Sequence, residues 1–304
     1  MIPFNVTILG SNSAVPSLER NPTSQVVEYR NKKFMIDCGE GTQLAMRRNK
    51  ISLQSVEHIF ISHLHGDHYF GLIGYLSTLH LLGRTKAMHV YGPAELEQII
   101  HLQLNASQTL LTYPLILHPT RSDEVSECYR DSDLSVVSFP MIHRIPTTGF
   151  IFKELQPLRH LRADVIRLLK IPFEKLDGIR KGDDFIDDAG KHYKNEEITI
   201  QASDSRMYVF FADTAISEKY ISLYKKADLI YHEATFMEFH KHAATEKFHS
   251  TAGQAAQLAR SAKAKQLIIG HFSARYKDTA GLLVEARAIF ANTEIAEEGR
   301  KFSV

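Results

Sequence analysis

The stretch His63-Leu64-His65-Gly66-Asp67-His68 places four metal-binding side chains within six residues. It follows an apolar stretch, His58–Ile61, with the length and composition of a strand, and it precedes a helical pattern over Tyr69–Leu82. His63 and His65 are two residues apart, so an extended backbone points both imidazoles to the same side. We therefore expect a cluster of ligand-type side chains just beyond the end of a strand.

The residue types in this stretch indicate a catalytic metal site. Gly66 permits a tight turn, which we expect to place Asp67 and His68 at the mouth of a helix that starts near Tyr69. Imidazole and carboxylate together suit Zn²⁺, and Mn²⁺, Fe²⁺ or Co²⁺ can compete for the same ligands. The absence of cysteine from the cluster argues against a closed structural zinc site.

Apolar, strand-length stretches alternate with helical patterns along the chain. This order predicts an α/β fold. The expected strands are Val6–Leu9, Phe34–Ile36, His58–Ile61, Met88–Tyr91, Leu134–Phe139, Met207–Phe211, Leu229–Tyr231 and Gln266–Ile269. The expected helices are Tyr69–Leu82, Pro93–Leu104, with Pro93 in its first turn, and Thr251–Lys263, with Ser250 as its N-cap.

A histidine or aspartate follows several of these strands at once. The residues are His63, His143, Asp213, His232 and His271. Ligands in open α/β sheets gather beyond the carboxyl ends of strands. The pattern therefore predicts one composite site, built from segments that are far apart in the chain.

The composition sets limits on the class of protein. The chain has 304 residues and a formal net charge of +1, so overall charge does not indicate a nucleic-acid partner. Its two cysteines, Cys38 and Cys128, form no CxxC pair, and we expect an intracellular, cytoplasmic protein without disulfides. No apolar run is long enough for a transmembrane helix, so no membrane partner is expected.

One segment, residues 153–197, is rich in positive charge and turns. Its helical periodicity extends from Arg162 to Leu169. Two interpretations stay open: a solvated surface helix, or an arm that contacts RNA phosphates. The positive residues are Arg159, Arg162, Arg167, Lys170, Lys175, Arg180 and Lys181.

The stretch from His63 to His68 resembles the HxHxDH signature of the metallo-β-lactamase superfamily. Further motifs resemble those of the superfamily in the same order: Asp37 in IDCGEGT, a structural acid beneath the site, His143 in MIHRIPTTGF, Asp213 in FFADTA and His271 in IIGHFSARY. The resemblance implies that His63, His65 and His143 hold one metal and that Asp67, His68 and His271 hold the other. Asp213 would bridge the two ions, which we expect to be Zn²⁺.

Three more motifs resemble the ribonuclease Z family within that superfamily. His232 and Glu233 lie in HEAT, His249 lies in HST, and Pro16 to Asn21 resemble the loop PxKxRN, with Leu18 in place of its lysine. The resemblance implies that Asp67 is catalytic, that His249 is a general acid and that Glu233 orients it. Substrate-binding roles are expected for Arg20, Asn21, Ser273, Arg275, Arg162, Arg167 and Lys170.

The resemblance implies a single 1–304 domain with the four-layer αβ/βα sandwich of the metallo-β-lactamase fold. Residues 153–197 would be a flexible inserted arm, or exosite, although the Gly-Pro tip of many such arms is missing. The implied activity is zinc-dependent removal of the 3′ trailer from precursor tRNA by a homodimer, leaving a tRNA 3′-hydroxyl and a trailer 5′-phosphate. The alternatives are another binuclear-metal phosphodiesterase, of the cyclic-nucleotide or arylsulfatase-like kind, and a non-catalytic RNA-binding module.

Overall fold

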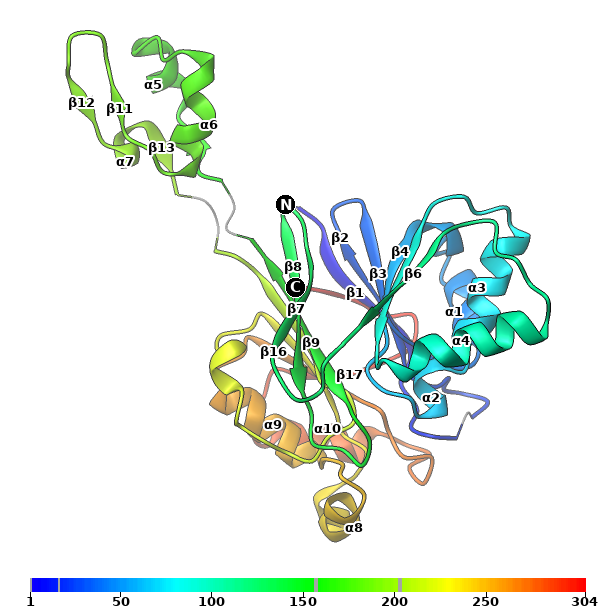
Figure 1. The fold of residues 1–304 in the computed structure, drawn as a ribbon. Coiled ribbons are helices and arrows are strands. Elements are labelled where there is room, and N and C mark those ends of the chain that lie inside the picture. The colour runs from blue at the N-terminus through cyan, green and yellow to red at the C-terminus, as the bar shows by residue number, and fades with distance from the viewer. Residues whose placement is uncertain (1, 16, 156–157, 202–203) are drawn as a thin grey trace. The chain divides into compact units, whose positions relative to one another are not determined.

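The computed structural model describes residues 2–15, 17–155, 158–201 and 204–304. The chain divides into two compact units (Figure 1). The first unit comprises Met1–Tyr129, Val136–Phe152 and Met207–Val304, and the second comprises Arg130–Ser135 and Lys153–Arg206.

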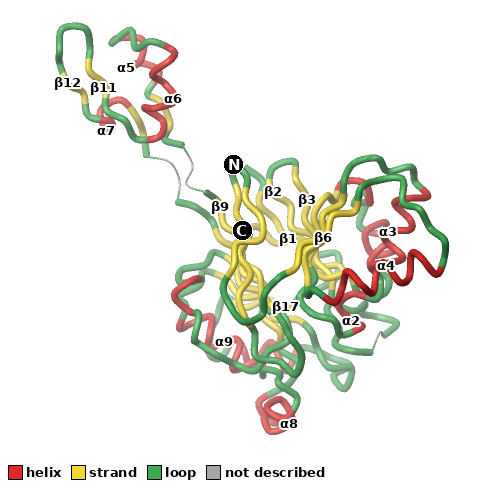
Figure 2. Tube along the Cα trace, viewed as in Figure 1, coloured by secondary structure: helices red, strands yellow, loops and turns green. Residues whose placement is uncertain are grey.

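Two seven-stranded sheets form the first unit (Figure 2). Strands β3 to β6 run parallel, whereas β1 pairs antiparallel with both β2 and β18. The strands of the first sheet, in spatial order, are β18 (Lys301–Ser303), β1 (Phe4–Gly10), β2 (Ser24–Tyr29), β3 (Lys32–Cys38), β4 (Val56–Phe60), β5 (Met88–Gly92) and β6 (Leu115–Pro119). Those of the second are β17 (Thr293–Ile295), β16 (Gln266–Gly270), β15 (Leu229–Glu233), β14 (Met207–Phe210), β9 (Thr148–Glu154), β8 (Leu134–Pro140) and β7 (Ser126–Arg130).

Helices cover the outer face of each sheet. Met35 and Ile59 of the first sheet pack on the helices, while their neighbours Phe34 and Phe60 turn inward and meet Phe152. This alternation is the period-two pattern of strands buried on both faces. On the first sheet lie α1 (Thr42–Arg48), η1 (Leu53–Ser55), α3 (Leu72–Leu81) and α4 (Glu95–Ala106), and on the second lie η2 (Ile221–Leu223), α9 (Ala252–Ser261) and α10 (Ala280–Arg287).

The architecture is the metallo-β-lactamase sandwich of two helix-covered sheets. The fold class predicted from the sequence is therefore confirmed. Among the described residues, every helix is too short or too polar to cross a bilayer. Both cysteines are free thiols.

The second unit has its own small apolar core. Ile171, Ile179, Phe185 and Ile198 are buried in it. Arg206 of the same unit donates two side-chain hydrogen bonds to Glu154. Its elements are β10 (His160–Leu161), α5 (Ala163–Leu168), α6 (Phe173–Lys181), β11 (Phe185–Ile186), β12 (His192–Tyr193), α7 (Asn195–Ile198) and β13 (Thr199–Ile200). Residues 156–157 and 202–203, part of the expected arm and of its flank, lie outside the described residues.

Several expected helix boundaries were wrong. The helix expected over Tyr69–Leu82 is two helices, α2 (Gly66–Tyr69) and α3, so Asp67 and His68 lie inside α2 rather than before it. The break falls at Gly71, where a side chain would collide with the backbone of Gly39.

The N-terminal signals of two more helices were also misread. The N-cap of α9 is Thr251, whose hydroxyl accepts the Gln254 N–H at 3.1 Å, and not Ser250, whose hydroxyl donates to Thr214 O. Helix α4 begins at Glu95, so Pro93 precedes its first turn.

Candidate metal centre

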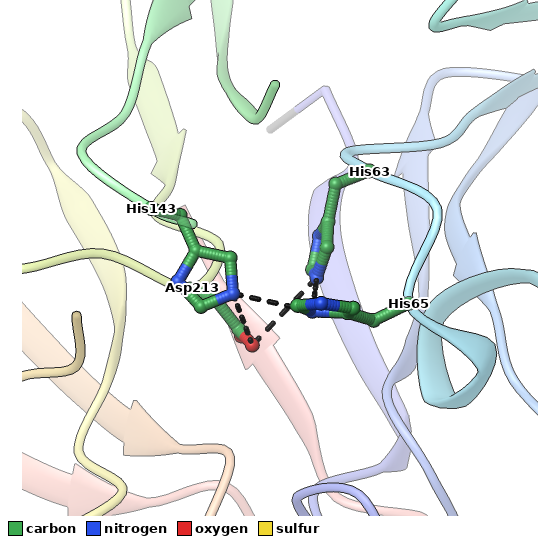
Figure 3. A group of neighbouring side chains, drawn as sticks. All are labelled: His63, His65, His143 and Asp213. Atoms are coloured by element: carbon green, nitrogen blue, oxygen red, sulfur yellow. Dashed lines mark hydrogen bonds and ion pairs between the residues drawn. The ribbon is translucent and has the colours of Figure 1, made fainter. Parts of the chain in front are cut away.

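Three histidines and an aspartate converge from three loops at the ends of strands (Figure 3). His65 Nδ1 lies 3.0 Å from His63 Nε2 and 3.2 Å from His143 Nε2. Asp213 Oδ2 lies 3.7 Å from His63 Nε2 and 3.8 Å from His143 Nε2. Three ring nitrogens and a carboxylate oxygen thus surround one point, as ligands surround a divalent cation.

A second group lies on the other side of Asp213. His68 Nε2 is 3.3 Å from His271 Nε2, and Asp67 Oδ2 is 3.5 and 3.3 Å from these two atoms. Asp213 Oδ1 lies 3.4 Å from His68 Nε2 and 3.1 Å from His271 Nε2. The two oxygens of Asp213 therefore face different groups, which is the arrangement of a bridging carboxylate.

Asp213 is nearly fully buried, and its Oδ1 atom has no hydrogen-bond donor among the residues that the structure describes. A buried carboxylate oxygen without a partner is costly. A divalent cation between Oδ1 and the neighbouring imidazoles would satisfy it. The residues present therefore fit a metal pair.

The outer ring nitrogens, which face away from the centre, are held by oxygen atoms in four of the ligand-type histidines. His68 Nδ1 lies 2.7 Å from Asp37 Oδ2, and His63 Nδ1 lies 3.0 Å from Ser62 Oγ. His143 Nδ1 lies 3.0 Å from Phe248 O, and His271 Nδ1 lies 2.9 Å from Thr235 Oγ1. Such partners fix the tautomer that turns the other nitrogen toward a metal.

Two residues of the centre, Asp37 and His271, have a left-handed backbone conformation. Asp37 has φ 55° and His271 has φ 57°, each at the end of its strand. Non-glycine residues adopt this conformation at a cost, and it is concentrated at functional sites. Asp37 also accepts the Ser62 backbone N–H at 2.8 Å, which ties the loop after β4 to β3.

Electrostatics keep three of the histidines and Asp213 ready to bind a cation, whereas His68 would have to give up a proton first. Burial lowers the pKa of His63, His65 and His143, so their lone pairs stay free of protons. Burial alone would raise the pKa of Asp213, but His271 and His68 hold it well below its usual range. Burial would likewise lower the pKa of His68, but Asp213, Asp67 and Asp37 raise it well above its ordinary value.

His249 lies beside the paired groups and is held by Glu233. Its Nδ1 lies 2.9 Å from Glu233 Oε1, and its ring centroid is 5.2 Å from that of His143 and 5.6 Å from that of His271. Burial lowers the pKa of His249, but the Glu233 charge outweighs it and raises that pKa to about 9. The imidazole is therefore a proton donor near neutral pH.

A cavity of about 440 Å³ opens over the centre. Asp67, Asp213 and His249 line it together with Phe70 and Arg144. The loop after β1 borders it, where Ala14 N–H donates to Asp67 Oδ2 at 2.7 Å. The cavity brings two of the expected catalytic residues, Asp67 and His249, to one solvent-accessible space, whereas Glu233 is fully buried and does not line it.

Other expected residues have different surroundings. The side chain of His232 points away from the centre: its ring stacks on Phe211, so the expectation that it emerges near the metals was wrong. Successive side chains of β15 point to opposite faces, and Glu233 takes the inner one.

The residues expected to bind substrate are spread over several places. Arg20 donates to Asn12 Oδ1 and Tyr276 O, and Asn21 donates to Glu298. Arg275 donates to Ser273 Oγ at 3.2 Å and lies over the Phe236 ring. Arg162, Arg167 and Lys170 are exposed in the second unit, and Pro16 lies outside the described residues.

Sequence reasoning missed three residues of the centre: Ser62, Thr235 and Arg144. Each is a direct neighbour of a motif or part of one, since Ser62 precedes His63, Thr235 ends HEAT and Arg144 follows His143. Only their adjacency could have drawn attention to them.

The chain is similar to several known proteins. The family model described as Anti-Pycsar protein Apyc1 matches residues 4–114. Ribonuclease Z of Phocaeicola vulgatus is 43% identical over 304 residues, covering 100% of this chain and 98% of its own. Ribonuclease Z of Cytophaga hutchinsonii is 43% identical over 307 residues, covering 99% and 96%.

Solved structures agree in fold. The crystal structure of human tRNase Z, short form, matches with a TM-score of 0.73 and 26% identity over 99% of each chain. The metallo-β-lactamase fold protein YhfI from Bacillus subtilis matches with a TM-score of 0.69 and 17% identity over 100% of each chain. Fold and site thus define a protein of the metallo-β-lactamase fold with a centre for divalent metal. Within that class, the chain belongs to the ribonuclease Z family.

Proposed function

We propose that this chain removes the 3′ trailer from precursor tRNA by hydrolysing one phosphodiester with two Zn²⁺ ions. Membership of the ribonuclease Z family makes it a metal-dependent endoribonuclease of tRNA 3′ processing. The observation that carries the metal chemistry is Asp213, whose two oxygens face two separate groups of ligand-type side chains. Mn²⁺ or another divalent ion could use the same ligands.

The proposed ligands divide as the two groups do. His63, His65 and His143 would hold one ion, Asp67, His68 and His271 would hold the other, and Asp213 would bridge them. Such a pair supplies an activated water and offsets the negative charge of a phosphodiester.

The protein's own groups would move the protons. Asp67 lines the cavity, so it would orient the attacking water and accept its proton. The water oxygen would form the new bond to phosphorus while the bond from phosphorus to the 3′ oxygen breaks. His249 would give its proton to that leaving oxygen, and Glu233 would hold the imidazole in place. The products would be a tRNA 3′-hydroxyl and a trailer 5′-phosphate.

The remaining substrate contacts would come from both units. Ser273 and Arg275 would contact the acceptor end, and Arg20 and Asn21 would form the loop that senses the 3′ end. The exposed Arg162, Arg167 and Lys170 of the second unit would bind phosphates of the tRNA body, as an exosite. We further propose a cytoplasmic homodimer.

The direct test is incubation of zinc-loaded protein with a precursor tRNA, followed by mapping of both product ends. Cleavage just beyond the acceptor stem, with a 3′-hydroxyl on the tRNA, is expected. The same assay with Asp67→Ala should give no product. Full cleavage by that variant would contradict a catalytic site here. Unchanged zinc-loaded protein that binds the tRNA without cleaving it would favour a non-catalytic RNA-binding module.

A second experiment separates this function from that of another phosphodiesterase. Glu154 N–H donates to Arg206 O at 3.0 Å, so the chain enters and leaves the second unit at neighbouring residues. Residues 155–205 can therefore be replaced by a short Gly-Ser linker. The shortened protein should lose tRNA cleavage yet hydrolyse a small aryl phosphodiester, whereas undiminished tRNA cleavage would contradict the exosite.

A further inference from the structure

Arg144 lies next to His143 in the loop between β8 and β9. Its exposed side chain lines the cavity above the centre. The Nη2 atom is 3.0 Å from His65 Nε2, and no other interaction of Arg144 occurs among the described residues. In particular, no carboxylate in that part of the chain forms an ion pair with it. A permanently charged group thus stands in the substrate cavity without an ion pair among the described residues, although the carboxylates of Glu40, Asp67 and Asp213 line the same cavity.

The partner of Arg144 is unusual for a ligand-type histidine. The outer nitrogens of His63, His68, His143 and His271 each meet an oxygen that can accept a hydrogen bond. The outer nitrogen of His65 meets a cation instead. Arginine has no acceptor, so this contact requires a lone pair on His65 Nε2.

The contact is incompatible with metal binding by His65. Its Nδ1 faces the Nε2 atoms of His63 and His143, so Nδ1 is the nitrogen that would bind the ion. The ring then carries its hydrogen on Nε2 and becomes a donor there. Two donors cannot bond, and the guanidinium has to turn to another acceptor.

We propose that Arg144 binds a non-bridging phosphate oxygen of the substrate, and that metal loading releases it from His65 for this purpose. The proposal rests on the proposed function, since it takes the ligand of the cavity to be a phosphodiester. Guanidinium is the side-chain group best shaped to hold a phosphate, and charge-assisted bonds of this kind are the strong ones. The alternative is a structural role in which Arg144 only orients His65.

The test measures binding of inorganic phosphate to zinc-loaded protein by calorimetry. Arg144→Ala should weaken phosphate binding about 10- to 100-fold, which is the range for one or two bonds to a charged group. Arg144→Lys should recover part of the affinity. Arg260→Ala, an exposed arginine on α9, should bind phosphate like the unchanged protein. In zinc-free protein the Arg144→Ala effect should shrink, because His65 then holds the guanidinium.

Elemental analysis of the same samples gives the second readout. Unchanged zinc content together with weakened phosphate binding supports the proposal. Unchanged phosphate affinity overturns it, whether or not zinc content falls, and a fall would assign Arg144 a structural role. Phosphate binding needs no tRNA, so a protein that binds phosphate through Arg144 but leaves precursor tRNA intact would overturn the proposed function alone.

Discussion

Replacing Glu233 by glutamine should damage stability and activity together. The carboxylate is fully buried and accepts from groups of three segments. Its Oε1 receives Thr214 N–H, Ser250 N–H and His249 Nδ1–H at 3.2, 2.9 and 2.9 Å. Its Oε2 receives the N–H and the hydroxyl of Thr235 at 2.9 and 2.8 Å.

The amide of glutamine cannot replace this carboxylate in either orientation. With its oxygen at the Oε1 position, its NH₂ group meets the Thr235 N–H. With its oxygen at the Oε2 position, the NH₂ group meets the donors of Thr214, Ser250 and His249. At least one buried donor loses its acceptor, at about 1–3 kcal/mol, and the bond to His249 loses its charge, at about 1.5–3 kcal/mol. We expect the free energy of unfolding to fall by about 3–5 kcal/mol.

The same substitution should slow the reaction through His249. Without the Glu233 charge, the pKa of His249 falls from about 9 to its ordinary value of 6.5 or lower. At pH 8 the protonated fraction then drops about 30-fold, and kcat should follow it, since this ring is the proposed acid.

Urea unfolding and the rate of precursor cleavage measure these two effects. Glu97→Gln, on the exposed face of α4, is the matched control and should stay within about 0.5 kcal/mol of the unchanged protein. The reasoning would be refuted if Glu233→Gln unfolded like this control and cleaved at the original rate.

Four further predictions concern the centre and the helix beside it. His249→Ala should lower kcat about 100- to 10,000-fold with little change in KM. A rise in KM with kcat unchanged would point to a role in substrate binding instead. In zinc-free protein the His249 ion pair stabilises fully below pH 6.5 and is lost as pH rises through about 9, so His249→Ala should flatten the pH dependence of unfolding across that window. Asp213→Ala should reduce zinc per chain in elemental analysis, and two ions retained would exclude bridging. Thr251→Ala should lower the free energy of unfolding by about 1 kcal/mol through loss of the α9 cap, and no change in the urea midpoint would refute that capping role.

Much of the centre could be predicted from the sequence because its determinants are local. The spacing of His63 and His65 after a strand is set by backbone geometry within a few residues. Each further ligand-type residue, such as Asp213 or His271, lies directly after an apolar strand or shortly beyond its end. The ends of neighbouring parallel strands meet at one edge of a sheet. The resemblance to the family's motifs further predicted which of these strand ends contribute residues to the same centre.

The sequence predicted less where two neighbouring residues suit the same role, or where the role depends on which face of a sheet a side chain occupies. Ser250 and Thr251 both suit an N-cap, and only the path of the chain past Thr214 assigns the cap to Thr251. His232 and Glu233 both end a strand, and the pleat turns one of them away from the centre. Sequence periodicity could not decide which of these two side chains faces the centre.

The tertiary structure alone decided how Asp213 divides its oxygens, which donors surround Glu233 and where Arg144 points. These relations join separate segments of the chain, and they change with shifts of about one ångström, because hydrogen bonds and metal ligation are short-ranged. A sequence pattern specifies which groups reach the end of a strand. The distance between two such groups depends on how the sheets and loops pack, and that packing is set by the whole chain.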